Sequence, residues 1–291
     1  MIARPGAQPP MKVHIPFTKA SGAGNDFVLI NNFKGTFRLD FARLALAACD
    51  RHFGIGADGL LVLERSTKAD FLMRYYNADG SWGGMCGNGG RCIARFALKE
   101  GIAGTTQHFE ALDYMYDAVV GETSVRLHMK DAAALRAEPV GQKYGLKGVS
   151  YFIDTGAPHA VVLEDALEVL DVHELGRRIR IDPAFAPDGT NVNFIRRKDE
   201  HSIEVRTYER GVEAETLACG TGSVASALVA SEHFRMTSPV HVLVRSGEEI
   251  LVHFHGQAGR WNDIYLEGSA HLVFSGTMIF ETDPPTISSP E

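Results

Sequence analysis

Short runs of β-branched and aromatic residues recur along the chain, and each is bounded by turn-forming residues. They predict strands near residues 27–30, 60–63, 71–76, 151–153, 161–163, 192–195, 203–208 and 240–245. Helical spacing, with apolar residues three and four positions apart, is found at residues 41–49, 91–100 and 223–233, and more weakly at 165–175. Strand outweighs helix, so the pattern predicts an α+β fold.

An internal repeat relates two segments that each contain a reactive candidate. The segments MCGNGGRCIARFALKEG and ACGTGSVASALVASEHF contain Cys86 and Cys219, and both read Cys-Gly-x-Gly followed by a predicted helix. The strand-like segments before them also align, so Asn77 and Glu209 occupy equivalent positions, nine and ten residues before the cysteines. Self-similarity of this kind reveals architecture directly.

Two further segments extend the repeat toward the N-terminus of each half. SGAGNDFVLI and DTGAPHAVVL align Gly24 with Gly156, and therefore Phe27 with His159. The intervals from these glycines to the following cysteines are 62 and 63 residues. Near-constant spacing over several aligned segments is improbable by chance, so the halves are expected to fold alike.

The repeat predicts two pseudo-symmetric domains, residues 11–140 and 141–280. Clefts between domains are where ligands bind preferentially, so the two cysteine motifs are expected to face each other across such a cleft. The Pro-rich residues 1–10 are expected to form a disordered extension, and residues 281–291 a similar tail.

Composition narrows the possible partners. The 291 residues are 45% hydrophobic with a formal net charge of −7, which is typical of a globular protein without the basic face that nucleic acid requires. No apolar run reaches about 18 residues and the N-terminus lacks the apolar core of a signal peptide, so neither membrane insertion nor secretion is expected. We predict a cytoplasmic protein whose oligomeric state is open, with a homodimer as one option.

The four cysteines are too few for a disulfide scaffold, so each is structural, metal-binding or reactive. Cys49 and Cys92 lie within predicted helices and are expected in the core. Cys86 and Cys219 each precede a helix start, where free N–H groups and the helix dipole are expected to lower the thiol pKa. The glycines are expected to allow close backbone approach and positive φ, so the same loop can bind a carboxylate.

Two thiols on opposite faces of one carbon would allow a two-base mechanism. A thiolate on one side removes a proton while a thiol on the other side delivers one, which inverts the configuration. Hydrogen bonds and fixed dipoles around the carboxylate would stabilise the carbanion, so no cofactor is expected.

A metal site is not expected. Cys-x5-Cys is not a typical structural zinc spacing, and no second pair or His-x3-His follows. A redox-sensing or metal-binding thiol module without turnover is the alternative from another functional class.

Several segments resemble the ordered motifs of the diaminopimelate epimerase family: KASGAGNDFVLINN, DRHFGIGADGLL, NADGSWGGMCGNGGRC, TGAPH, GTNVNF and YERGVEAETLACGTG. The resemblance implies an isomerase that interconverts LL- and meso-2,6-diaminopimelate without pyridoxal phosphate, toward lysine and peptidoglycan precursors. It also implies that each domain is a mostly antiparallel, barrel-like sheet around a central helix. The implied partner is a small-molecule substrate.

The resemblance also implies roles for individual residues. Cys86 and Cys219 would transfer the protons, and His159 and Glu209 would orient or deprotonate the thiols. Arg210 would bind a carboxylate as a fork, which suits guanidinium chemistry. The remaining substrate-binding residues would be Glu209 again, with Asn25, Asn77, Gly87, Asn88, Asn191, Gly220 and Thr221.

Two positions depart from the family pattern. Many members have Asn where this chain has Ala157, and Gln is often found where it has Gly59. These changes remove two polar contacts but leave the cysteine chemistry in place. An epimerase or racemase of another amino acid, such as proline or hydroxyproline, or a phenazine-biosynthesis isomerase, is therefore the alternative within the same mechanism class.

Overall fold

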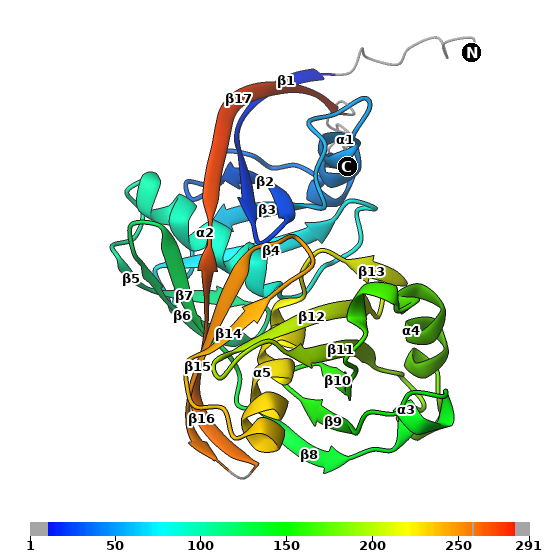
Figure 1. Ribbon diagram of the computed structural model, residues 1–291. Helices are drawn as coiled ribbons and strands as arrows, with labels where there is room; N and C mark the ends of the chain where they lie inside the picture. Colours follow the sequence, from blue (N-terminus) through cyan, green and yellow to red (C-terminus); the bar gives the residue numbers. More distant parts are fainter. Residues whose placement is uncertain (1–10, 258, 283–291) are drawn as a thin grey trace, which may run out of the picture.

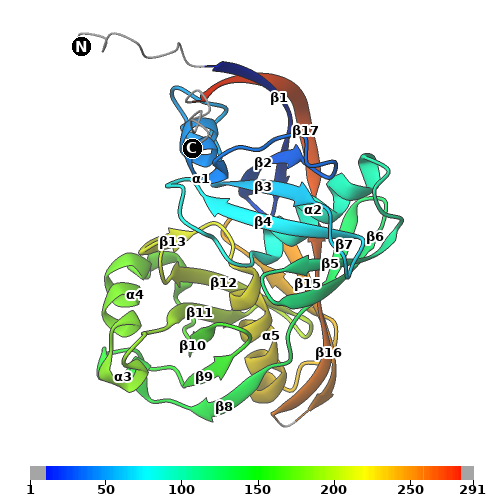
Figure 2. The same cartoon turned by 180° about the vertical axis from the view of Figure 1, so that it is seen from behind.

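Two helices stand at the centres of two similar halves in the computed structural model, which describes residues 11–257 and 259–282 (Figures 1 and 2). They are α2 (Gly87–Lys99) and α5 (Gly220–Phe234). Helix α5 consists of small and apolar residues on nearly all sides, which is typical of a helix buried on every face. Both contact the strands of their own half all around, so the α+β prediction with a central helix in each half is confirmed.

The N-terminal half contains eight strands and one outer helix. The helix is α1 (Phe41–Cys49), which covers β2 and β3 and forms its own apolar cluster with them. The strands are β1 (Met11–Gly22), β2 (Asn25–Asn31), β3 (Gly59–Glu64), β4 (Phe71–Asn77), β5 (Thr106–Ala111), β6 (Tyr114–Val120), β7 (Ser124–His128) and β17 (His271–Thr282).

Within the described residues, the C-terminal half contains nine strands, two outer helices and two 3-10 turns. The strands are β8 (Ala133–Ala137), β9 (Ser150–Asp154), β10 (Pro158–Leu163), β11 (Asn191–Arg197), β12 (Ser202–Glu209), β13 (Ala214–Thr216), β14 (Val240–Leu243), β15 (Glu249–Gln257) and β16 (Arg260–Ser269). The helices are α3 (Val140–Lys143) and α4 (Val172–Arg180), and the turns are Leu167–Val169 and Pro183–Phe185.

All the strands of the described residues join in one hydrogen-bonded network. Four pairs are parallel, β2 with β3, β4 with β5, β10 with β11 and β12 with β14, and the other strand pairs are antiparallel. The halves are connected where β7 pairs with β16, and after β16 the chain returns to the N-terminal half, where β17 pairs with β1 (Figure 1). The division at residues 140 and 141 stays a proposal.

Strand register reproduces the alignment found in the sequence. Phe27 pairs with Gly59 across parallel β2 and β3, as His159 pairs with Asn191 across β10 and β11. Gly59 pairs in turn with Asn77 on β4, and the pairing of β11 with β12 has the same sense and register. The two halves therefore present equivalent positions to the space between them.

The turns at the start of the two halves explain one pair of aligned glycines. Gly24 lies between β1 and β2 with φ of 97°, and Gly156 lies between β9 and β10 with φ of 90°. A side chain would be strained in this left-handed region, so glycine is required at both turns.

Some predicted boundaries are wrong. The helix expected at residues 165–175 is a short 3-10 turn followed by α4, because the Asp171 side chain accepts the Glu174 N–H and caps the helix one residue before Val172. The central helices begin earlier than expected, directly after Cys86 and Cys219. Residues 281 and 282 belong to β17 rather than to a tail, while residues 1–10 and 283–291 lie outside the described residues.

Candidate active site

The N-termini of α2 and α5 abut each other. A Cβ atom added to Gly220 would lie 3.4 Å from the Cα of Gly87, and Leu266 packs against both glycines. Cys86 and Cys219 are the N-cap residues of the two helices, and both line one cleft of about 1020 Å³. The fold therefore brings the two cysteines, which are distant in sequence, into one cleft, as the sequence predicted.

Close approach, rather than unusual backbone conformation, explains the glycines of the two Cys-Gly-x-Gly motifs. None of the four has positive φ, so that expectation is wrong. A Cβ on Gly222 would lie 2.4 Å from Asn193 Oδ1, and one on Gly87 would lie 3.0 Å from the Leu266 side chain. The glycines let the first helical turns approach their neighbours and leave N–H groups free at the cleft.

The Cys219 thiol is connected to a buried polar chain. Its Sγ lies 3.6 Å from Thr221 Oγ1, which lies 3.0 Å from His159 Nε2. Asn193 donates its amide N–H to His159 Nδ1 at 3.0 Å and accepts the Thr207 hydroxyl at 3.0 Å. Because Nδ1 accepts, the neutral ring carries its proton on Nε2 and donates it to Thr221, whose own hydroxyl proton is free to point at the sulfur.

The side chain beneath the helix start at Cys86 is apolar rather than polar. The Cys86 Sγ accepts the Gly89 N–H at 3.5 Å, and the side chain of Leu61 lies beneath the first turn of the helix, near Gly89. Leu61 occupies the position that Asn193 has in the other half, because each lies under the third residue after its cysteine.

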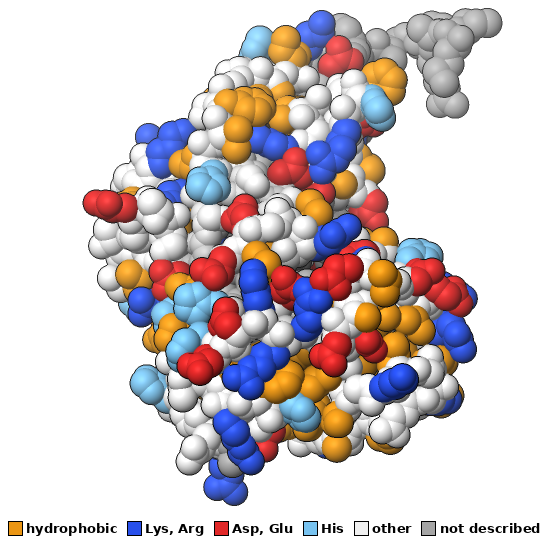
Figure 3. Space-filling view, in the orientation of Figure 1, with side chains coloured by type: hydrophobic (Ala, Val, Ile, Leu, Met, Phe, Trp, Pro, Cys, Tyr) orange, Lys and Arg blue, Asp and Glu red, His pale blue; other side chains and the backbone are white. Residues whose placement is uncertain are grey.

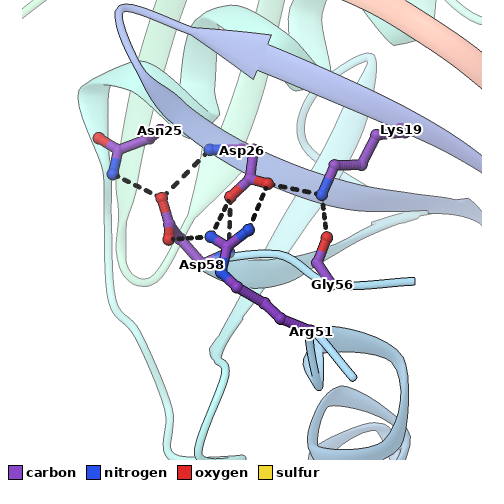
Figure 4. A network of polar contacts seen from close by, with 6 residues as sticks. All are labelled: Lys19, Asn25, Asp26, Arg51, Gly56 and Asp58. Carbon is purple, nitrogen blue, oxygen red and sulfur yellow. Dashed lines mark hydrogen bonds and ion pairs between the residues drawn. The ribbon is translucent and has the colours of Figure 1, made fainter. Parts of the chain in front are cut away.

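A charged network supports the N-terminal wall of the cleft (Figure 4). Arg51 forms a fork with Asp26 through hydrogen bonds of 2.9 and 3.1 Å, and one of its nitrogens also binds Asp58 at 2.9 Å. Lys19 binds the same Asp26 at 2.7 Å and the carbonyl of Gly56. Two cations therefore balance two carboxylates here, and they hold the pKa of Asp26 below its ordinary value despite its burial.

This network reaches the helix start through two amides. Asn25 donates to Asp58 at 2.9 Å and accepts from Asn88 at 2.6 Å, and Asn88 in turn accepts from the buried Arg91 at 2.9 Å. The two asparagines line the cleft with fixed orientations, as does Asn77, whose amide donates to Ser81 at 2.9 Å.

The opposite wall carries Glu209 and Arg210. Both line the cleft, and the Arg210 guanidinium donates to the Asp188 carbonyl at 3.5 Å. Asn191 does not line it: its amide donates to the Pro158 carbonyl at 3.0 Å and accepts the Arg210 N–H at 2.9 Å. Asn191 thus fixes the backbone that presents Arg210.

Comparison with known proteins gives a match over most of the chain. The family model described as diaminopimelate epimerase matches residues 17–112 and 151–273. A diaminopimelate epimerase of Chlorobaculum tepidum is 48% identical over 262 residues, covering 89% of this chain and 99% of that protein. One of Aquifex aeolicus is 39% identical over 90% of this chain and 97% of its own. The chain belongs to the diaminopimelate epimerase family.

Solved structures extend the likeness in fold beyond this family. A phenazine biosynthesis protein of Bacillus anthracis superposes with a TM-score of 0.72 at 14% identity, covering 92% of this chain and all of the other. A hydroxyproline epimerase of Agrobacterium vitis has a TM-score of 0.61 at 17% identity, covering 94% of each chain. At such identities the likeness concerns the fold that this diaminopimelate epimerase family member shares with them.

Burial dominates the acid–base properties of the site. It raises the pKa of the Cys86 thiol although the N–H groups of Gly89 and Asn88 act in the opposite direction. Burial also raises the pKa of the Cys219 thiol, where the nearby Glu209 adds to the effect and the Thr221 hydroxyl opposes it. The expectation of a lowered thiol pKa is therefore wrong for the site without substrate, because one or two hydrogen bonds do not replace the lost hydration.

The same cause shifts the pKa values of two acid–base neighbours of the thiols in the direction that favours their neutral forms. Burial lowers the pKa of His159 to about 3, with Arg210 contributing, and it raises the pKa of the Glu209 carboxyl. His159 is completely buried beneath Thr221 and does not line the cleft. Its ring is linked to Cys219 through the Thr221 hydroxyl.

The other cysteines behave as core residues. Cys49 and Cys92 are buried, and burial raises the pKa of each to about 12. All four cysteines are free thiols, and within the described ranges no group of three or more His, Cys, Asp or Glu side chains is arranged to hold a metal ion. None of the helices in residues 11–257 and 259–282 is long and apolar enough to span a membrane.

Sequence reasoning missed several residues that shape this diaminopimelate epimerase site. All but Thr207 lie inside the motifs that carry the resemblance, and a search for charged and amide side chains within those motifs would have found these six. The missed residues are Lys19, Asp26, Arg51, Asp58, Arg91, Asn193 and Thr207.

Proposed function

We propose that this chain interconverts LL- and meso-2,6-diaminopimelate by moving a proton between its α-carbon and Cys86 on one face and Cys219 on the other. The abutment of α2 and α5, with a cysteine capping each helix in one cleft, is the observation that carries the proposal. The curated relatives, which match over nearly their whole length and are named diaminopimelate epimerases, supply the substrate. The step leads toward lysine and peptidoglycan precursors.

The chemistry needs one thiolate and one thiol. As one thiolate forms its S–H bond, the α-carbon C–H bond breaks and the electron pair moves toward the substrate carboxylate. The opposite thiol then gives its proton to the other face, forming the new C–H bond and leaving a thiolate. Free N–H groups at the two helix starts, at Gly87, Asn88, Gly220 and Thr221, would hold the carboxylate and its growing charge.

Because the thiol pKa values are raised in the free site, the bound substrate has to favour ionisation of one thiol. A diaminopimelate molecule brings ammonium groups into the cleft, and an opposite charge nearby favours ionised groups. Glu209 can take the thiol proton or bind an ammonium group, and His159 polarises Thr221 toward Cys219. Asn25, Asn77 and Arg210 would bind the distal end, with Asn191 holding the Arg210 backbone.

Deuterium exchange tests the proposal. In deuterated water the enzyme should place deuterium on the α-carbon during turnover, which proton NMR detects as loss of the α-proton signal. Cys86→Ala and Cys219→Ala should each lose activity by roughly 100-fold or more, the scale of a removed acid–base group. Cys92→Ala is the matched control, because it removes a buried thiol of the same helix that does not line the cleft.

Two outcomes would contradict the proposal. Turnover that survives Cys86→Ala, or full equilibration with the α-proton retained, would refute the two-base mechanism. Assays with proline, hydroxyproline and other amino acids, followed by optical rotation, would reveal another substrate. A cytoplasmic location, a homodimer and the lack of a nucleic-acid partner stay predictions; acidic and basic side chains lie interspersed on the face in Figure 3.

A further inference from the structure

The two halves differ in the side chains that lie below the equivalent cysteines. In the C-terminal half His159, Asn193 and Thr207 form a hydrogen-bonded row on adjacent strands. Strand register places Phe27, Leu61 and Tyr75 at the equivalent positions of the N-terminal half. Two of these three are apolar, so the phenol hydroxyl of Tyr75 is the polar group that this row can offer.

The Tyr75 ring occupies space that side chains at two neighbouring positions would otherwise fill. A Cβ on Gly59 would lie 2.4 Å from its Cε2, and a Cβ on Gly83 would lie 2.3 Å from its Cδ1. Phe27 packs edge-on against the ring with a centroid distance of 6.0 Å. The ring is therefore held on three sides. It fills the space that a side chain at position 59 would otherwise occupy.

Among the described residues, none forms a hydrogen bond with the hydroxyl of Tyr75. The residue is 9% exposed and lines the cleft, yet its hydroxyl forms no hydrogen bond with any residue of the described chain. Burial, with the nearby Cys86, Asp58 and Glu209, raises its pKa, so the phenol stays a neutral donor. A phenol hydroxyl at the cleft that no protein group engages is free to donate a hydrogen bond to a ligand.

We propose that Tyr75 is a further substrate-binding residue, whose hydroxyl donates a hydrogen bond to a carboxylate oxygen of the substrate. It compensates for the missing polar side chain at position 59 and supplies the donor from the neighbouring strand. The inference rests on the proposed function, since the substrate must bind in this cleft. The substrate has two carboxylates, one at the reacting carbon and one at the distal end, and kinetics distinguish them.

Tyr75→Phe removes the hydroxyl and keeps the ring, and Tyr76→Phe is the matched control. Tyr76 is the next residue of β4, and its ring packs against Trp82 and Phe41 rather than lining the cleft. We expect Tyr75→Phe to lower kcat/KM roughly 10- to 100-fold, the scale of a lost hydrogen bond to a charged group, and Tyr76→Phe to change it less than about twofold.

The kinetic constants then identify the carboxylate. A contact with the distal carboxylate is the same in the ground state and the transition state, so its loss raises KM and leaves kcat unchanged. A contact with the reacting carboxylate strengthens as charge develops there, so its loss lowers kcat. Equal kcat and KM values in Tyr75→Phe and the unsubstituted enzyme would overturn the proposal.

A binding measurement separates this proposal from the proposed function. In the Cys86→Ala background, calorimetric titration with diaminopimelate should show roughly tenfold weaker binding when Tyr75→Phe is added, provided circular dichroism shows both variants folded. Unchanged binding together with unchanged kinetics refutes the role of Tyr75 alone. An unsubstituted enzyme that does not turn over or bind diaminopimelate refutes the proposed function instead.

Discussion

Replacing Thr221 tests the polar chain beneath Cys219. Thr221→Val keeps the β-branched shape and the backbone N–H but removes the hydroxyl that lies 3.0 Å from His159 Nε2 and 3.6 Å from the sulfur. A hydrogen bond to a charged group stabilises by about 1.5–3 kcal/mol, so its loss should reduce kcat/KM by roughly 10- to 100-fold. Both directions should fall equally, because their ratio is fixed by the reaction equilibrium.

The pH profile gives the sign of the effect. The Thr221 hydroxyl favours the thiolate of Cys219 and so lowers the thiol pKa against the effect of burial. Its removal should raise that pKa, and the alkaline limit of kcat/KM should move about 1–2 pH units upward. Thr221→Ser retains the hydroxyl and serves as the control. A Thr221→Val enzyme with normal kinetics, or a Thr221→Ser enzyme that is equally impaired, would refute the role of the hydroxyl.

Three further predictions concern burial. His159 has its pKa lowered to about 3 in the folded state against about 6.5 when unfolded, so the unfolded state binds the proton first. As the pH is lowered from 6.5 to 5, the free energy of unfolding should therefore fall by about 1 kcal/mol per pH unit more than in His159→Gln, as urea titrations would show; parallel curves would contradict this. Gly83→Ala should destabilise by about 1–3 kcal/mol because it clashes with the Tyr75 ring, and this cost should vanish in a Tyr75→Ala background; an unchanged cost would place the strain elsewhere. Iodoacetamide should inactivate slowly at pH 7 and faster as pH rises, with protection by substrate, since burial raises the pKa of both cleft thiols; fast inactivation at neutral pH would mean that a thiolate is already present.

The cysteine pair and the equivalence of the two halves could be predicted from the sequence, because both are written in local segments at constant spacing. The contacts of Thr221 with His159, and of Tyr75 with Gly59 and Gly83, could not. They depend on which residues of neighbouring strands stand opposite each other, and a one-residue slip of register would change every such contact. The return of β17 to β1 is likewise a pairing between the two ends of the chain that no local pattern encodes.

The thiol pKa values were predicted with the wrong sign for a related reason. A helix start is visible in the sequence, whereas the depth at which the sulfur is buried depends on the packing of the whole fold, including Leu266 from β16 against Gly87 and Gly220. The sequence motif predicts the N–H groups that stabilise the thiolates and lower the thiol pKa. Burial in the fold raises the thiol pKa by more than these groups lower it.

In the proposed two-base mechanism, the pseudo-symmetry of the cleft is needed only where the two thiols meet the reacting carbon. The two faces of that carbon require equivalent proton donors and acceptors, and the duplicated helix starts at Cys86 and Cys219 provide them. The rest of a diaminopimelate molecule is not symmetric about this carbon, because a long chain with a second amino-acid group extends from one side. The residues around the two cysteines therefore have to differ between the halves to bind such a substrate, as His159 in one half and Tyr75 in the other illustrate.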